Sequence, residues 1–192
     1  MFSQITPRML VGGWIDRRIN VNVLAFSGVS HIVNFSSEKL TELEKNQFWV
    51  LELDEGLLDL PHDISYWEPV FNFAHKAMYG TKDAVIYFHS CPEERFRSPI
   101  ACYAAMRALG YSMIQARRKL EVVHPILSWC ERAARGVDDS FREWCRLRGR
   151  NPVLREKECE RIHEDLGAIR LLAANSPLVQ TVLDEPTFDD LL

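Results

Sequence analysis

The sequence lacks the features that mark secreted, metal-binding or membrane-spanning proteins. Its 192 residues contain five cysteines, an odd number, and no two of them form a C-x-x-C pair, so neither zinc binding nor a disulfide framework is indicated. No uninterrupted apolar run reaches the roughly 18 residues that a membrane-spanning helix needs. The first ten residues hold no basic region followed by an apolar core, which a secretory signal requires. We therefore expect a cytoplasmic location and no membrane contact.

A strong charge of one sign is also lacking. The formal net charge is −4 and 26% of the residues are charged, as in an ordinary soluble protein. Such a balance does not favour nucleic acid or an anionic membrane as a partner. What the chain does have is 47% hydrophobic residues, enough for the core of one globular domain with an appendage.

Apolar patterning predicts strands and helices that alternate along the chain. Short apolar runs between turn residues predict strands at 9–11, 31–35, 48–53 and 84–88. Helical spacing predicts helices at 20–26, 65–80, 98–109, 112–123 and around 129–134. Capping boxes that would start helices are found at Thr41, Ser65 and Ser112. This alternation predicts an α/β domain with a central, mostly parallel sheet flanked by helices.

The domain is expected to occupy residues 1–150, because residues 148–152 combine glycine, asparagine and proline in the manner of a joint. Residues 151–192 then form an appendage. It begins with a predicted helix at 153–174 and ends in an acidic stretch at 184–190, which we expect to lack a fixed structure.

One strand–loop–helix junction carries reactive side chains. Cys91 is followed by five residues and then by Arg97 and Ser98, between the strand at 84–88 and the helix at 98–109. Ligands of a parallel sheet bind beyond the carboxyl ends of its strands, where a helix N-terminus offers unpaired N–H groups and about half a positive charge. That field lowers a thiol pKa from about 8.5 into the ~3.5–7.5 range. Cys91 is therefore a candidate thiolate nucleophile for phosphorus.

The residues around Cys91 suit the same chemistry. Arg97 offers a planar fork for two phosphate oxygens, and the Ser98 hydroxyl can donate to the thiolate when that later becomes the leaving group. The expected phosphate-binding loop consists of Pro92, Glu93, Glu94, Arg95, Phe96 and Arg97. The alternative is a buried cysteine followed by a charged surface loop, because a Cys-x5-Arg spacing alone is common.

These residues give the chain a resemblance to a known family. The dual-specificity branch of the protein tyrosine phosphatases has the signature His-Cys, two residues, Gly, two residues, Arg-Ser, which Cys91, Arg97 and Ser98 resemble. Further stretches are similar to segments of that family, and together they span about residues 5–147: 5–13, 24–34, 63–67 and 98–116. The resemblance implies the dual-specificity phosphatase fold and hydrolysis of a phosphomonoester through a phosphocysteine, with no metal or cofactor.

The signature loop is atypical. Ser90 precedes the cysteine, His89 lies one place early, and Glu94 takes the glycine position. Pro92 has no N–H to offer a phosphate. At ~5 Å and an effective dielectric of ~20, each of the carboxylates of Glu93 and Glu94 would repel a unit of negative charge by about 3 kcal/mol. These departures leave open a phosphatase-like binding module with weakened or lost catalysis.

An alternative register aligns His89-Ser90 with the His-Cys pair and makes Ser90 the nucleophile. It places Phe96 where the arginine belongs and loses the Arg-Ser pair, so we favour Cys91. A third possibility treats Cys91 as a redox or transfer nucleophile, as in sulfurtransferases, and the residues after Arg97 argue against it.

The resemblance also implies a general acid, an aspartate in the loop after an earlier strand. Asp54 directly follows the strand at 48–53 and ranks first, Asp59 ranks second, and Asp63 is expected to cap the next helix. The expected substrate is a protein carrying phosphotyrosine, phosphoserine or phosphothreonine. A phosphoinositide or an RNA 5′-phosphate are the other substrates that the resemblance allows, and the oligomeric state is left open.

Overall fold

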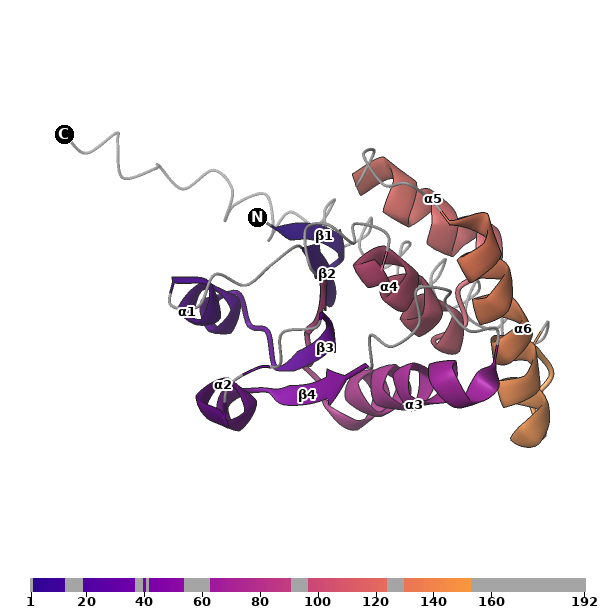
Figure 1. Cartoon of the computed structure of the whole chain (residues 1–192), viewed down its shortest axis with the longest axis horizontal. Helices are drawn as coiled ribbons and strands as arrows, with labels where there is room; N and C mark the ends of the chain where they lie inside the picture. Colours follow the sequence, from indigo (N-terminus) through magenta and orange to yellow (C-terminus); the bar gives the residue numbers. More distant parts are fainter. Residues whose placement is uncertain are drawn as a thin grey trace, which may run out of the picture.

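The computed structural model describes residues 2–12, 19–36, 40, 42–53, 63–90, 97–123 and 130–152. These residues form one sheet and two layers of helices (Figure 1). The predicted capping box at Thr41, the helix at 153–174 and the acidic stretch at 184–190 lie outside the described residues. Within the described residues, no helix is long and apolar enough to cross a membrane.

The sheet has five strands in the order β1-β2-β5-β3-β4. The strands are β1 (Phe2–Thr6), β2 (Met9–Gly12), β3 (His31–Phe35), β4 (Trp49–Glu52) and β5 (Ile86–Ser90). The first two pair antiparallel, and all other neighbours pair parallel. The predicted mostly parallel α/β sheet is thereby confirmed. The buried β5 lies at its centre, as expected of a continuous apolar run.

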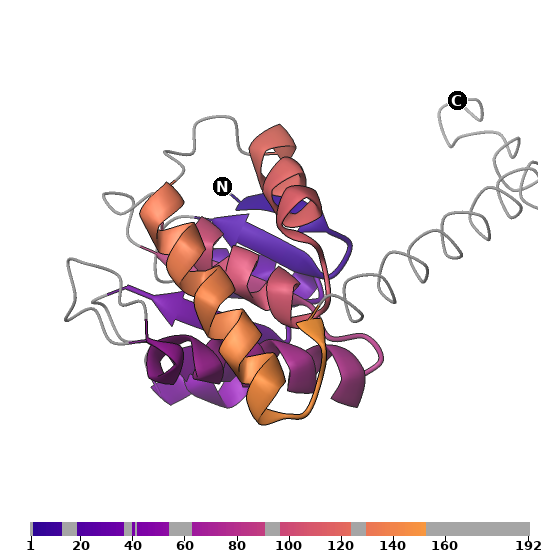
Figure 2. The same ribbon diagram turned by 90° about the vertical axis from the view of Figure 1, so that its right-hand side faces the viewer.

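Helices cover both faces of the sheet. Helices α1 (Ile19–Phe26) and α2 (Glu42–Gln47) lie on one side, and α3 (Ile64–Gly80), α4 (Arg97–Ala108), α5 (Met113–Val123) and α6 (Glu131–Leu147) lie on the other (Figure 1). Figure 2 shows α6 crossing the outside of the helical layer, where it packs on α3 and α4. The larger hydrophobic core lies between the sheet and α3 to α6, and a smaller core lies under α1.

Two of the three predicted capping boxes lie within the described residues. The Ser112 box is confirmed: Ser112 N–H donates to Gln115 Oε1 at 3.1 Å, and Gln115 N–H donates to Ser112 Oγ at 3.3 Å. The Ser65 box is wrong, because α3 already begins at Ile64 and its N-cap is Asp63. The Asp63 carboxylate accepts from Ser65 N–H at 3.1 Å, so the cap lies two residues earlier than predicted and satisfies one of the unpaired N–H groups of the first turn.

Arg8, in the turn between β1 and β2, ties this hairpin to the end of α3. Its guanidinium donates to the carbonyl oxygens of Ala84, Met78 and Thr81 at 2.8, 3.3 and 2.7 Å. Carbonyls at a helix C-terminus have no partner within the helix, and a cation there is favoured by the helix dipole. Arg8 therefore stabilises the α3–β5 connection from a distant part of the chain.

Candidate active site

The strands of the parallel part of the sheet end at one common edge. Gly12 and Asn34 both lie opposite His89, and Phe35 lies opposite Ser90. Helix α4 begins at Arg97, and six residues separate it from the end of β5 at Ser90. The predicted junction is therefore a central buried strand, a six-residue connection and a helix N-terminus at the carboxyl edge of the sheet. This is the geometry in which α/β proteins bind ligands.

Ser98 is anchored to two strands by hydrogen bonds. Ser90 Oγ donates to Ser98 Oγ at 3.0 Å, and Ser98 Oγ donates to the Gly12 carbonyl oxygen at 3.4 Å. Both serines are almost completely buried. The start of α4 is thus fixed against the carboxyl ends of β5 and β2, which are neighbouring strands of the sheet.

Arg97 is buried beside Ser98 in the first turn of α4 and is 4% exposed. Its Cζ lies 5.6 Å from the centroid of the Phe35 ring, at the end of β3. That ring stacks on Trp67 of α3, with 6.5 Å between centroids and 11° between the planes. The guanidinium therefore lies over the Phe35 ring, which is itself stacked on Trp67. It is placed at a helix end whose dipole already favours an anion.

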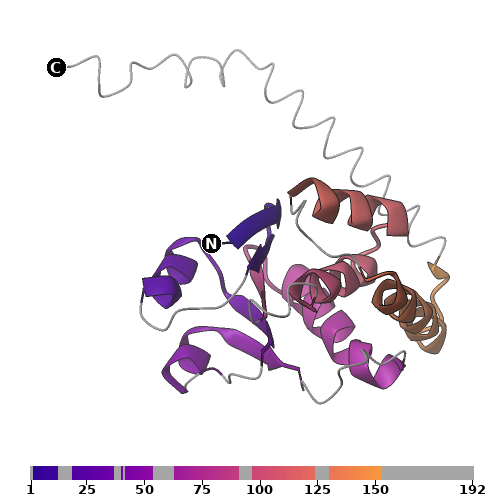
Figure 3. The same cartoon turned by 45° about the horizontal axis from the view of Figure 1, so that its top comes forward.

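His89 lies on the other face of the sheet. Side chains alternate along a strand, and His89 stacks on Tyr87, with 6.1 Å between centroids and 17° between the planes. Tyr87 belongs to the smaller core beneath α1. Figure 3 shows α1 and α4 on opposite sides of the sheet. His89 is therefore packed away from the face that carries Arg97 and Ser98.

Cys91, residues 92–96, Asp54 and Asp59 lie outside the described residues. Asp63 caps α3, as predicted. Hydrogen bonds from Ser65 lower the pKa of the Asp63 carboxyl, so it remains an acceptor for the helix.

The described cysteines are packing residues. Cys102 and Cys145 are buried and Cys130 is half-buried. Burial raises the pKa of the Cys102 thiol far above its usual value. A buried neutral thiol is a poor nucleophile, so Cys102 does not compete for the role assigned to Cys91.

Sequence reasoning missed a buried ion pair next to the site helix. Arg107 of α4 donates through Nε to Asp138 Oδ1 of α6 at 2.7 Å, and Tyr103 Oη donates to both carboxylate oxygens at 3.0 and 2.9 Å. Burial raises the pKa of Asp138, and the neighbouring guanidinium opposes that rise. The only local signal is that Tyr103 and Arg107 lie four residues apart, on one helix face.

Comparison with solved structures identifies the fold. PTPMT1, in a crystal structure with PI(5)P, superimposes with a TM-score of 0.62 and 16% identity over 74% of this chain and 95% of that chain. Human DUSP28 gives a TM-score of 0.58 at 19% identity over 74% and 96% of the two chains. The human tyrosine phosphatase-like serine/threonine/tyrosine-interacting protein gives 0.56 at 15% identity over 74% and 97%.

No protein-family profile matches the sequence, and no curated protein matches it either. At identities of 15 to 19%, the superpositions establish the fold alone. The chain therefore has the fold of the dual-specificity branch of the protein tyrosine phosphatases, as its sequence resemblance implied.

Proposed function

We propose that the protein is a cysteine-dependent phosphatase. The Cys91 thiolate attacks phosphorus, so that an S–P bond forms and the P–O bond to the leaving group breaks, while Asp54 gives its proton to the leaving oxygen. Water then attacks the phosphocysteine and passes a proton to Asp54. The S–P bond breaks, and phosphate and the thiolate are released, with Ser98 donating to the sulfur. Arg97 and the loop amides of residues 93–96 hold the phosphoryl oxygens.

One observation carries the proposal. Arg97 and Ser98 are buried side by side at the N-terminus of α4, directly after the segment that contains Cys91. A cation in the first turn of a helix opposes the helix dipole, so helix stability does not explain Arg97. An anionic ligand would be favoured by the guanidinium and the dipole together.

The hydrogen bonds at the site favour Cys91 over Ser90 as nucleophile. Ser90 is the last residue of β5 and its hydroxyl donates to Ser98. A serine nucleophile needs a base that removes its proton, and here the proton is directed to another hydroxyl. Ser90 is better suited to holding Ser98 in place.

Strand register supports Asp54 as the general acid. Asn34 lies opposite both Glu52 and His89, and Leu53 N–H donates to the Asn34 carbonyl at 2.9 Å. Glu52 lies two residues before Asp54 and His89 lies two residues before Cys91, and Glu52 and His89 are at the same level of the sheet. The two strands are separated by β3, hence by roughly 10 Å. A phosphomonoester bound between the two positions could contact both residues.

The second candidate function is a binding module with weakened or lost catalysis. Pro92 and Glu94 motivate it, and one similar structure is itself named phosphatase-like and interacting. We infer a phosphorylated protein as the substrate of an active enzyme. A phosphoinositide is the alternative, because the similar PTPMT1 structure contains PI(5)P.

Hydrolysis of p-nitrophenyl phosphate by the wild type and by Cys91→Ser separates these functions. We expect turnover by the wild type and none by Cys91→Ser, while Ser90→Ala, the matched control, keeps measurable activity. Loss of activity in Ser90→Ala but not in Cys91→Ser would support the alternative register. No turnover by a folded wild type, with retained binding of a phosphopeptide, would support the binding module.

A poor leaving group tests the general acid. With an alkyl phosphate, Asp54→Asn should lower the rate by roughly 10²–10⁴-fold, the usual value of general acid catalysis. The loss should be smaller with an activated aryl phosphate. If Asp59→Asn shows this pattern and Asp54→Asn does not, Asp59 is the acid.

A further inference from the structure

A surface pocket lies at the opposite edge of the sheet from the candidate active site. It has a volume of about 210 Å³ and is lined by His31, Trp49, Phe73, Lys76, Ala77, Gly80 and Thr81. His31 and Trp49 are the first residues of β3 and β4, and the others belong to the last turns of α3 and the residue after it. Pockets for drug-sized ligands measure about 300–1,000 Å³, so this one suits a single side chain.

The walls of the pocket are aromatic. The His31 and Phe73 rings meet edge to face, with 5.5 Å between their centroids, and Trp49 is 71% exposed at the rim. Aromatic rings pair favourably in edge-to-face or offset geometry. An exposed tryptophan beside an aromatic pocket is therefore suited to receiving another aromatic side chain.

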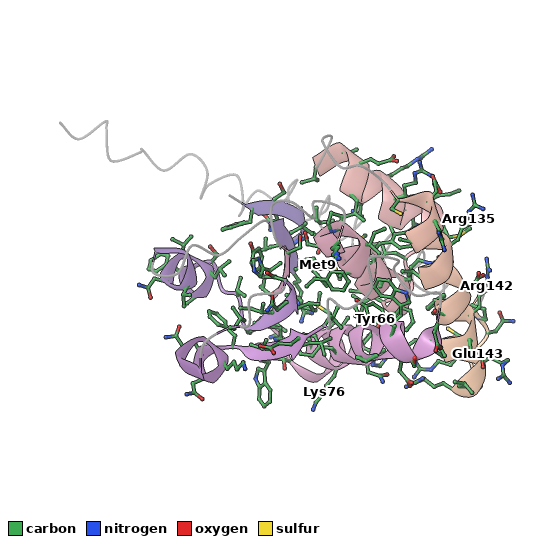
Figure 4. The ribbon with its side chains drawn as sticks, viewed as in Figure 1. Met9, Tyr66, Lys76, Arg135, Arg142 and Glu143 are labelled. Carbon is green, nitrogen blue, oxygen red and sulfur yellow. The ribbon has the colours of Figure 1, made fainter. Side chains whose placement is uncertain are left out.

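The wall of the pocket also carries one positive charge, that of Lys76. None of its lining residues is acidic, and Lys76 has no ion-pair partner within the described residues. Figure 4 shows Lys76 pointing outward from α3. The negative end of the α3 dipole is covered by Arg8, so it opposes an anion at this place only weakly. The pocket therefore favours an aromatic group flanked by negative charge.

The chain itself contains such a segment. Residues 184–192 read DEPTFDDLL, so Phe188 has two acidic residues on each side. In the described part, the chain past α6 lies beside α3: Arg150 Nη1 is 3.4 Å from His75 Nε2, and His75 precedes Lys76. Thirty-six residues separate position 152 from position 188. Even with the predicted helix at 153–174, which would be about 33 Å long at 1.5 Å per residue, the 14 positions from 174 to 188 can extend about 46 Å at 3.3 Å per residue, so Phe188 can reach back to the pocket.

We propose that residues 184–192 dock on this pocket in the same molecule, with Phe188 between Trp49 and Phe73 and with Asp189 and Asp190 beside Lys76. The inference is independent of the proposed catalytic function. Tethering supports it, because docking within one chain is an intramolecular step that does not depend on protein concentration. A contact too weak to form between separate molecules can therefore be populated within one chain.

The indole N–H signal of Trp49 in a ¹H–¹⁵N spectrum of the full chain tests the proposal. The signal can be assigned with Trp49→Phe, and that of Trp144, whose indole donates to Asn72 Oδ1 at 3.1 Å, serves as an internal reference. Phe188→Ala should shift the Trp49 signal and leave the Trp144 signal in place. Leu178→Ala, a comparable apolar loss outside the acidic stretch, is the matched control and should change neither.

Charge reversal tests the proposed attraction between Lys76 and the two aspartates. Lys76→Glu should shift the Trp49 signal toward its position in Phe188→Ala, and adding Asp189→Lys and Asp190→Lys should restore the wild-type position. The proposal is overturned if Phe188→Ala leaves the Trp49 signal unchanged, or if Leu178→Ala shifts it equally. A wild-type signal that moves on 100-fold dilution would assign the pocket to a second copy of the chain and would also overturn docking within one molecule.

Discussion

Replacing Asp138 with asparagine tests how strongly the buried ion pair holds α4 to α6. Asp138 is 6% exposed and accepts hydrogen bonds from Arg107 and Tyr103. The Arg107 Cζ also lies 4.5 Å from the centroid of the Phe141 ring of α6. Asparagine keeps the size of the side chain but removes its charge. Arg107 would then remain buried without its counter-charge.

The expected loss follows from that burial. Removing one partner of a buried ion pair costs about 3–5 kcal/mol, because the remaining charge is left without compensation. The free energy of unfolding of a domain is usually about 5–15 kcal/mol, so this loss would remove a large part of it. Asp139 is the matched control, since it pairs with Arg142 at 2.8 Å on the exposed side of α6. Asp139→Asn should cost only about 0.2–1 kcal/mol.

Urea unfolding of the three proteins measures the difference. For a slope of about 2 kcal/mol per molar urea, Asp138→Asn should lower the midpoint by roughly 1.5–2.5 M. The double variant Arg107→Met/Asp138→Leu should recover much of the loss, because it leaves no buried charge. If Asp138→Asn loses no more stability than Asp139→Asn, the pair does not hold the helices as described.

Three further predictions concern the two edges of the sheet. Ser98→Ala should keep a burst of p-nitrophenol but lower the steady-state rate by roughly 10–100-fold, because a hydrogen bond to the charged sulfur of the leaving thiolate is lost. Ser98→Thr should keep most of the steady-state rate. Equal losses of burst and steady-state rate in Ser98→Ala would contradict the proposed role of Ser98 in releasing the thiolate. Burial, with a nearby guanidinium, lowers the pKa of His31 below its usual 6.5, so the unfolded chain binds a proton that the folded chain does not. Wild-type stability in urea should therefore fall between pH 7.5 and pH 5.5 by more than that of His31→Asn, and equal falls would contradict this. A Cβ at Gly12 would clash with Tyr87 Oη, so Gly12→Ala should lower the free energy of unfolding, measured in urea, by about 1–3 kcal/mol. Adding Tyr87→Phe should recover part of that loss. A Gly12→Ala variant as stable as the wild type would mean that the Tyr87 side chain moves aside without cost.

The predictable parts of the fold are those that neighbouring residues determine. The apolar run before Cys91 predicted the central strand, although β5 reaches Ser90 rather than ending at Phe88. The Ser112–Gln115 box correctly predicted the start of α5. Such signals depend on hydrogen bonds or packing within a few residues, and a sequence contains them directly.

Other parts depend on distant contacts. Among the described residues, the last helix was predicted only around 129–134, but α6 runs from Glu131 to Leu147. Gly136 and the pair Asp138-Asp139 are poor helix formers, and packing of the buried side of α6 on α3 and α4 overrides them. At the site, the sequence predicted a strand, a loop and a helix that begins at Ser98, and α4 begins one residue earlier, at Arg97. The sequence could not predict the hydrogen bonds of Ser98 to Ser90 and Gly12, which require the sheet.

The contacts of Arg8 have a consequence for the order of folding. Its three carbonyl acceptors lie 70, 73 and 76 positions after Arg8 in the sequence. Contacts over such separations form only after a long loop has closed, which slows folding. The last turn of α3 should therefore gain its full protection late, when the β1–β2 hairpin docks. Slow hydrogen exchange of the Thr81 amide, which donates to the Ala77 carbonyl at 3.2 Å, would then report the arrival of the first ten residues rather than the formation of the helix.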